Sequence, residues 1–108
     1  MRFTRIQFER SGGFAGITQS YSVSLDTLPE EKRRELEELI SSAHFFDLPD
    51  EIGQPELSRD PFHYKIAVES DQATREVRFF DPVPAELAPL SNWLKAAARE
   101  HRAKDRPA

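Results

Sequence analysis

The chain has 108 residues, of which 38% are hydrophobic and 31% charged, so it suits one folded domain and is too apolar for a disordered tail. Its formal net charge is −4, and residues 26–60 carry eleven acidic and four basic side chains, which excludes nucleic acid as a partner of that half. The sequence has no cysteine, no apolar leader and no stretch near the roughly 20 apolar residues of a membrane span, so we expect a cytoplasmic protein that does not enter a membrane.

Two alternating segments near the start predict a β-hairpin. Residues 2–10 and residues 17–25 each repeat apolar side chains at every second position, which is the period of a half-buried strand. The side chains expected on the inner face are Thr4, Ile6, Phe8, Tyr21, Val23 and Leu25. Residues 11–16 then form the tip of the hairpin.

The predicted tip reads Ser11-Gly12-Gly13-Phe14-Ala15-Gly16 and places one aromatic side chain among three glycines. A hairpin turn needs only one or two residues that tolerate positive φ, so Phe14 has no turn-forming role. These residues leave two interpretations open. Phe14 is an exposed anchor for a partner, or it folds back to cap the core while the glycines form a wide turn or bulge.

A helix is predicted after the hairpin. Thr27 and Glu30 have the spacing of a capping box, and Pro29 stands in the first turn, where its missing N–H does no harm. The apolar stripe of this helix consists of Leu36, Leu39, Ile40 and Ala43, and its opposite face is charged and solvated. Phe45, Phe46 and Leu48 are expected to close the core beneath the helix end, and Pro49 to stop the helix.

Residues 50–61 have no periodicity and are predicted to be a long connecting loop, which is either a plain connector or a second contact with a partner. A second hairpin follows, with a turn at residues 70–73, and its inward side chains are Phe62, Tyr64, Ile66, Val68, Val77 and Phe79. The chain ends in a helix after Pro84, with Leu87, Leu90, Leu94 and Ala97 on one face and Trp93 beside it.

These elements predict the α+β class. We expect a two-layer domain in which a four-stranded antiparallel sheet carries two helices on one face, in the order ββα-ββα. The domain should span residues 1–98, and the basic residues 99–108 should be a frayed tail. Six side chains are expected to be buried in the core: Leu36, Leu39, Phe46, Ile66, Val77 and Leu90.

The sequence offers no site for an enzyme, and we expect neither a metal nor a cofactor. His44, His63 and His101 are scattered and lack the spacing of a zinc site. Ser11 lies beside glycines but without the strand-turn-helix setting of a nucleophile elbow. The glycine loop precedes a strand, whereas a phosphate cradle precedes a helix. A binding protein is therefore favoured over an enzyme.

The order and spacing of several segments resemble the emfourin family over most of the chain, from about Arg2 to Leu94. The segments that carry the resemblance are Phe8 to Ile17, Leu28-Pro29-Glu30-Glu31, Ala43 to Pro49, Phe62 to Val68 and Val77 to Asp81. Emfourins are small bacterial inhibitors of protealysin-like, thermolysin-type zinc metallopeptidases. The resemblance thus implies an inhibitor whose partner is such a metallopeptidase. We expect it to be a monomer, although the sequence does not determine the oligomeric state.

The resemblance also implies which residues bind the target: Ser11, Gly12, Gly13, Phe14, Ala15 and Gly16. Thermolysin-type peptidases favour a bulky apolar side chain just after the scissile bond, and Phe14 matches that preference. Glycines allow a backbone to approach a cleft closely. The alternative is a non-inhibitory adaptor or structural partner that uses the same hairpin to bind an unrelated protein.

Overall fold

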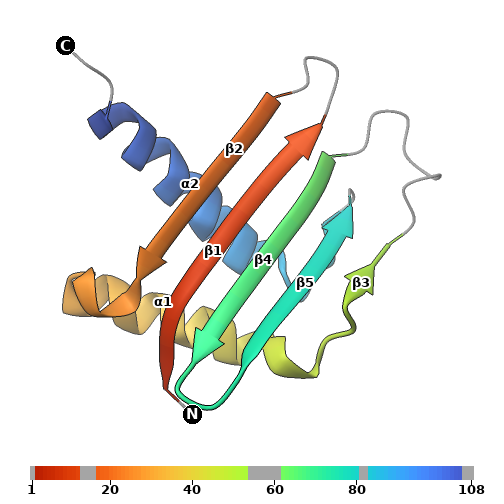
Figure 1. The fold of residues 1–108 in the computed structure, drawn as a ribbon, viewed down its shortest axis with the longest axis horizontal. Coiled ribbons are helices and arrows are strands. Elements are labelled where there is room, and N and C mark those ends of the chain that lie inside the picture. The colour runs from red at the N-terminus through yellow and green to blue at the C-terminus, as the bar shows by residue number, and fades with distance from the viewer. Residues whose placement is uncertain (1, 13–16, 54–61, 81–82, 106–108) are drawn as a thin grey trace.

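The computed structural model describes residues 2–12, 17–53, 62–80 and 83–105, which form a five-stranded sheet with two helices on one face (Figure 1). The strands are β1 (Phe3–Gly12), β2 (Ile17–Ser24), β3 (Glu51–Ile52), β4 (Phe62–Ser70) and β5 (Thr74–Phe80). The helices are α1 (Glu30–Ser42) and α2 (Ala88–Asp105), and two short 3-10 turns are η1 (Leu25–Thr27) and η2 (Phe45–Asp47). The predicted α+β class is confirmed.

The sheet has the order β2-β1-β4-β5-β3. The two predicted hairpins, β1–β2 and β4–β5, are antiparallel, and β1 joins them by pairing antiparallel with β4. The prediction of four antiparallel strands in the order ββα-ββα was wrong in detail, because β3 adds a fifth strand that runs parallel to β5. The sheet is therefore mixed.

The fifth strand lies inside the segment that the sequence predicted as a loop. Glu51 and Ile52 pair with Arg78 and Phe79, and the Arg78 N–H donates to the Asp50 carbonyl at 2.8 Å. An ion pair of 3.1 Å between Arg75 and Asp50 holds the same corner. A strand of two residues is too short to show a period of two, so these long-range contacts, rather than any local pattern, decide its structure.

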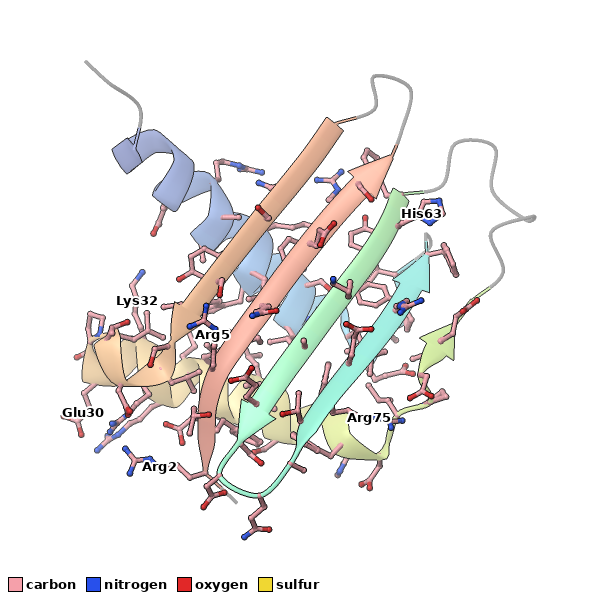
Figure 2. The ribbon with its side chains drawn as sticks, viewed as in Figure 1. Arg2, Arg5, Glu30, Lys32, His63 and Arg75 are labelled. Carbon is pink, nitrogen blue, oxygen red and sulfur yellow. The ribbon has the colours of Figure 1, made fainter. Side chains whose placement is uncertain are left out.

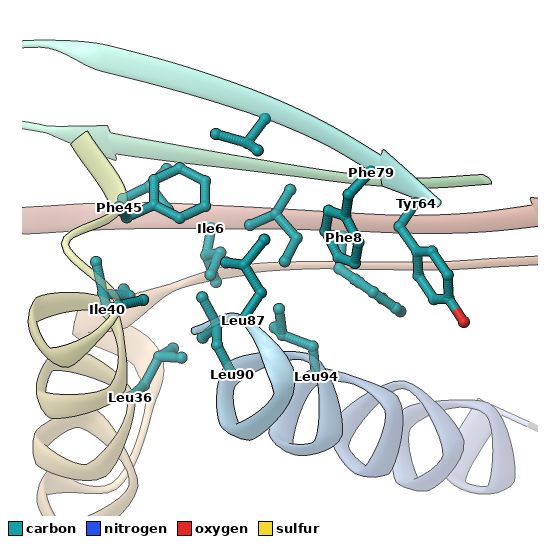
Figure 3. Packing of buried hydrophobic residues seen from close by; sticks show 14 of the residues in the cluster. Ile6, Phe8, Leu36, Ile40, Phe45, Tyr64, Phe79, Leu87, Leu90 and Leu94 are labelled. Atoms are coloured by element: carbon teal, nitrogen blue, oxygen red, sulfur yellow. The ribbon is translucent and has the colours of Figure 1, made fainter. Parts of the chain in front are cut away.

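The core fills the space between the sheet and the helices, as Figure 3 shows from close by. The sheet contributes the buried side chains of Ile6, Phe8, Tyr64, Ile66, Val68, Val77 and Phe79, the helices contribute Leu36, Ile40, Leu90 and Leu94, and the turn before α2 contributes Leu87. These positions follow the two-residue period of the strands and the helical stripes. Along α2 the stripe ends with Ala98, which is buried, whereas the predicted Ala97 is only partly so.

Four of the six predicted core residues, Leu36, Ile66, Val77 and Leu90, are confirmed as buried. Leu39 and Phe46 are only partly buried, so that prediction was wrong for them. For Phe46, the partial exposure follows from His44, whose φ of +50° turns the chain sharply after α1. This turn directs Phe45 into the core, where 1% of its surface is exposed, and leaves Phe46 stacked on Phe3 with ring centroids 6.1 Å apart.

The helix ends also differ from prediction. Thr27 does not cap α1, because it lies in η1 and its Oγ1 donates to the Ser24 carbonyl at 2.7 Å. Pro29 takes the N-cap position without a side-chain hydrogen bond. The helix ends at Ser42, before the stop predicted at Pro49, because the left-handed conformation of His44 prevents continuation.

Helix α2 runs through Asp105, so the backbone of residues 99–105 is helical. Fraying of this end, and the domain limit at residue 98, stay predictions. Within the part of the chain that the structure describes, neither helix combines the length and the apolar character needed to cross a membrane.

The two adjacent phenylalanines give a test of the core. Phe45→Ala should lower the free energy of unfolding by about 3 to 5 kcal/mol, because it empties a fully buried site. Phe46→Ala should cost less, about 1 to 2 kcal/mol, because its ring is partly exposed already. Urea unfolding of both variants measures the difference, and an equal or reversed order would contradict the described core.

Candidate functional site

Strand β1 ends, and strands β2 and β4 begin, at the same end of the sheet, where the chain leaves β1 toward the predicted hairpin tip. We call this row of strand ends, as distinct from the outermost strands, the edge. Gly12 pairs with Ile17 of β2 on one side and with Phe62 of β4 on the other. Next to them, His63 pairs with Phe80 at the end of β5. Only residues 13–16 connect Gly12 to Ile17, so the predicted loop starts from a base that is fixed by strands on both sides.

The structure places two of the six predicted target-binding residues. Ser11 and Gly12 are the last residues of β1, so they belong to the sheet and not to a free turn. Gly13, Phe14, Ala15 and Gly16 lie outside the described residues. Gly12 has a φ of +106°, a conformation that glycine adopts without the steric cost that a Cβ brings. Gly12 therefore shapes the point at which the chain leaves the strand.

On the face toward the helices, this edge carries a cluster of cations and aromatic rings. The guanidinium of Arg10 lies 4.0 Å from the ring centroid of Phe62 and 5.9 Å from that of Tyr64. The Lys95 ammonium from α2 lies 5.3 Å from the Tyr64 ring, and Tyr64 stacks on Phe79 at 4.8 Å. We call Arg10, Phe62, Tyr64 and Lys95 the cationic-aromatic cluster.

This cluster was missed by the sequence analysis, although a signal for it was present. Arg10 continues the inward series of Ile6 and Phe8, so a period of two already places its charge on the core face of the strand. The side chain is half-buried, and its Nε is buried without a hydrogen-bond partner among the described residues. A cation at such a position needs the compensation that the Phe62 ring gives it.

The opposite, open face of the same edge is polar. Ser11, His63 and Phe80 are neighbours across three strands, and they line a shallow cavity of about 120 Å³ together with Glu9, Lys65 and Arg78. The His63 ring packs edge-on against Phe80 with centroids 5.0 Å apart, and Figure 2 shows His63 at this end of the sheet. Lys65 pairs with Glu9 at 3.3 Å.

Ser11 and His63 are cross-strand neighbours, but no hydrogen bond joins these two described side chains. A serine nucleophile needs a hydrogen-bonded base that is itself oriented by a third group. The described residues also bring together no group of three His, Cys, Asp or Glu side chains that could hold a metal ion. This edge therefore combines a backbone held by strands on both sides, an aromatic pair and cations.

The pKa of one titratable side chain of β2, Tyr21, is shifted. Burial raises the pKa of the Tyr21 hydroxyl above its ordinary value of 10.0, and the nearby Glu100 carboxylate of α2 adds to the effect. The hydroxyl therefore stays neutral throughout the physiological range.

The comparisons with known proteins gave one match. A family model described as Emfourin matches residues 8–95, which is most of the chain. No curated protein and no solved structure matches the chain.

Gly12 can be tested directly. Gly12→Ala should lower the free energy of unfolding by about 1 to 3 kcal/mol, because it forces a Cβ into a positive-φ conformation. Ser11→Ala, one position away in the same strand, should change it by only about 0.5 kcal/mol. Urea unfolding compares the two, and a Gly12→Ala protein as stable as Ser11→Ala would contradict the described backbone.

Proposed function

Since the chain belongs to the Emfourin family, we propose that it is a protein inhibitor of a bacterial, protealysin-like zinc metallopeptidase of the thermolysin type. The proposal includes a cytoplasmic location and action as a monomer. The family match over residues 8–95 is the observation that carries it. That match includes the whole predicted loop, the β1 residues from Phe8 to Gly12 before it and all of β2 after it.

The inhibitor would plug the substrate cleft with the loop of residues 11–16 and remain uncut. One feature of the described residues supports this action. The base of the loop is hydrogen-bonded into the sheet on both sides, through Ile17 and Phe62. A base held in this way loses little further conformational freedom on binding, which favours affinity.

Within the loop, Phe14 is the proposed anchor. A single aromatic side chain in a pocket can supply a large part of the binding energy of a small interface. In the proposed complex, Phe14 fills the pocket for the bulky apolar residue after the scissile bond. The neighbouring glycines let the backbone approach the floor of the cleft without side-chain clashes.

The inhibition would work by occupying the cleft and not by removing the zinc ion. In the regions that the structure describes, no three potential ligands gather, and the chain has no cysteine thiolate, the strongest zinc ligand among side chains. The peptidase would keep its metal in the complex.

Titration of the purified protein into a protealysin-like peptidase, with cleavage of a fluorogenic peptide as the readout, tests the proposal. A stoichiometric loss of activity supports inhibition. Binding without loss of activity would favour the adaptor alternative, and neither binding nor inhibition would contradict the proposed function.

Phe14→Ala should weaken inhibition by about 30-fold to 1000-fold, because it removes the proposed anchor. Its free energy of unfolding should change by only about 0.5 kcal/mol. Phe46→Ala is a matched control, since this aromatic contacts Phe3 at the other end of β1 and should affect stability but not inhibition. If Phe14 instead caps the core, its variant will be unstable and, once folded, will inhibit normally.

Added zinc gives a separate test of the mechanism. A modest excess of zinc over the inhibitor should leave the inhibited activity unchanged, because the peptidase has not lost its metal. The measurement compares peptidase activity in the complex with and without zinc, using a chelator-inhibited sample as the positive control. Recovery in both samples would show that the protein acts by chelation.

A further inference from the structure

Arg10 differs from the described cations that pair with carboxylates, because aromatic rings are its partners, as the Tyr64 ring is one for Lys95. Its guanidinium lies over the Phe62 ring at 4.0 Å, and no described carboxylate lies within 4.0 Å of it. The buried Nε has no acceptor among the described residues. The cation is thus held in place but has no described anionic partner.

Most of the other described cations have a carboxylate partner instead. Seven arginine and lysine side chains pair with carboxylates at 3.0 to 3.7 Å, and they are Arg2, Lys32, Arg33, Arg34, Lys65, Arg75 and Arg78. The acid next to Arg10 in sequence, Glu9, points to the opposite face of the sheet and pairs with Lys65 there. The carboxylate nearest to Arg10 in the sequence therefore does not pair with it.

The stacking fixes how Arg10 can bind a partner. A ring below the guanidinium occupies its flat face and leaves the in-plane N–H donors directed to the side. These donors form a fork that fits the two oxygens of a carboxylate. Lys95, 5.3 Å from the adjoining Tyr64 ring, adds a second positive charge to the cluster. The positive charge of Arg10 favours an acidic partner.

The position of Arg10 links it to the proposed loop. It stands two residues before Gly12, about 7 Å along the strand at the usual rise per residue. It is also flanked by Gln19 of β2 and Tyr64 of β4, one on each side. A protein that encloses the loop of residues 11–16 would pass over this cluster.

We propose that Arg10, stacked on Phe62, binds an aspartate or glutamate side chain of the target peptidase beside the inserted loop. This inference rests on the proposed function and adds a second, charged contact to it. The aromatic anchor would supply apolar binding energy, and Arg10 would fix the orientation of the inhibitor on the rim of the cleft.

Arg10→Gln tests the inference, with Arg5→Gln as a matched control. Arg5 lies on the same strand, exposed on the open face, with its Nη2 bonded to Ser22 Oγ at 2.8 Å, and its variant changes the net charge equally. Arg10→Gln should raise the inhibition constant by about 10-fold to 100-fold, and Arg5→Gln should stay within about twofold of the wild type. Arg10→Lys should lie between, because it keeps the charge but loses the fork.

Ionic strength gives an independent readout. Wild-type inhibition should weaken between about 50 mM and about 500 mM sodium chloride, since salt screens a charge pair at the rim of an interface. Arg10→Gln should lose most of this dependence, and Arg5→Gln should keep it. A purely structural role for Arg10 would lower the urea midpoint without changing the salt dependence.

The outcomes separate the two proposals. A wild-type protein that fails to inhibit overturns the proposed function and this inference with it. A wild-type protein that inhibits, together with a folded Arg10→Gln variant that inhibits equally well, overturns this inference alone. If Arg10→Gln does not fold, Arg10→Lys decides, because unchanged inhibition by that variant would also overturn it. Glu56 and Asp60 are the acidic residues that precede Phe62 in the sequence. If Glu56→Gln or Asp60→Asn weakens inhibition as much as Arg10→Gln does, the carboxylate belongs to this chain, and the inference is overturned as well.

Discussion

The fold depends on β1 being hydrogen-bonded along its length on both sides. Its pairing with β2 is set by a local hairpin, but its pairing with β4 joins residues that are 50 (Gly12 and Phe62) to 67 (Phe3 and Ser70) positions apart in the sequence. That second ladder brings the two hairpins into one sheet and creates the single face on which α1 and α2 pack. It also aligns Gly12, Ile17 and Phe62 at one edge, so the candidate site exists only because the ladder forms.

The sequence predicted those parts of the fold that have a period. Alternation located the four long strands, and the helical stripe located Leu36, Ile40, Leu90 and Leu94 in the core. It failed at Glu51–Ile52 and at Phe46, where the structure is decided by contacts from distant residues and by one left-handed residue, His44. Such features leave no repeating pattern, because a two-residue strand and a single turn are shorter than any period.

The candidate site was predicted only in part. The unusual composition of residues 11–16 identified the loop, and Ser11 and Gly12 now stand at its base. Arg10 was overlooked because a cation near a strand end is ordinarily assigned to solvent. Its significance comes from Phe62, which is remote in sequence and becomes its neighbour through the β1–β4 ladder. Alternation alone gives the face of a side chain but not the ring that lies against it.

The anchored base of the hairpin has an evolutionary consequence. Gly12 and Ile17 are fixed in the sheet by backbone pairing, which does not depend on the identity of a side chain. Under the proposed function, selection acts on the loop between them to follow a changing enzyme, while this backbone pairing is kept. The backbone pairing at the base of the loop is what must be kept, and Gly12, with its positive φ, is a position in it where the side chain is constrained as well.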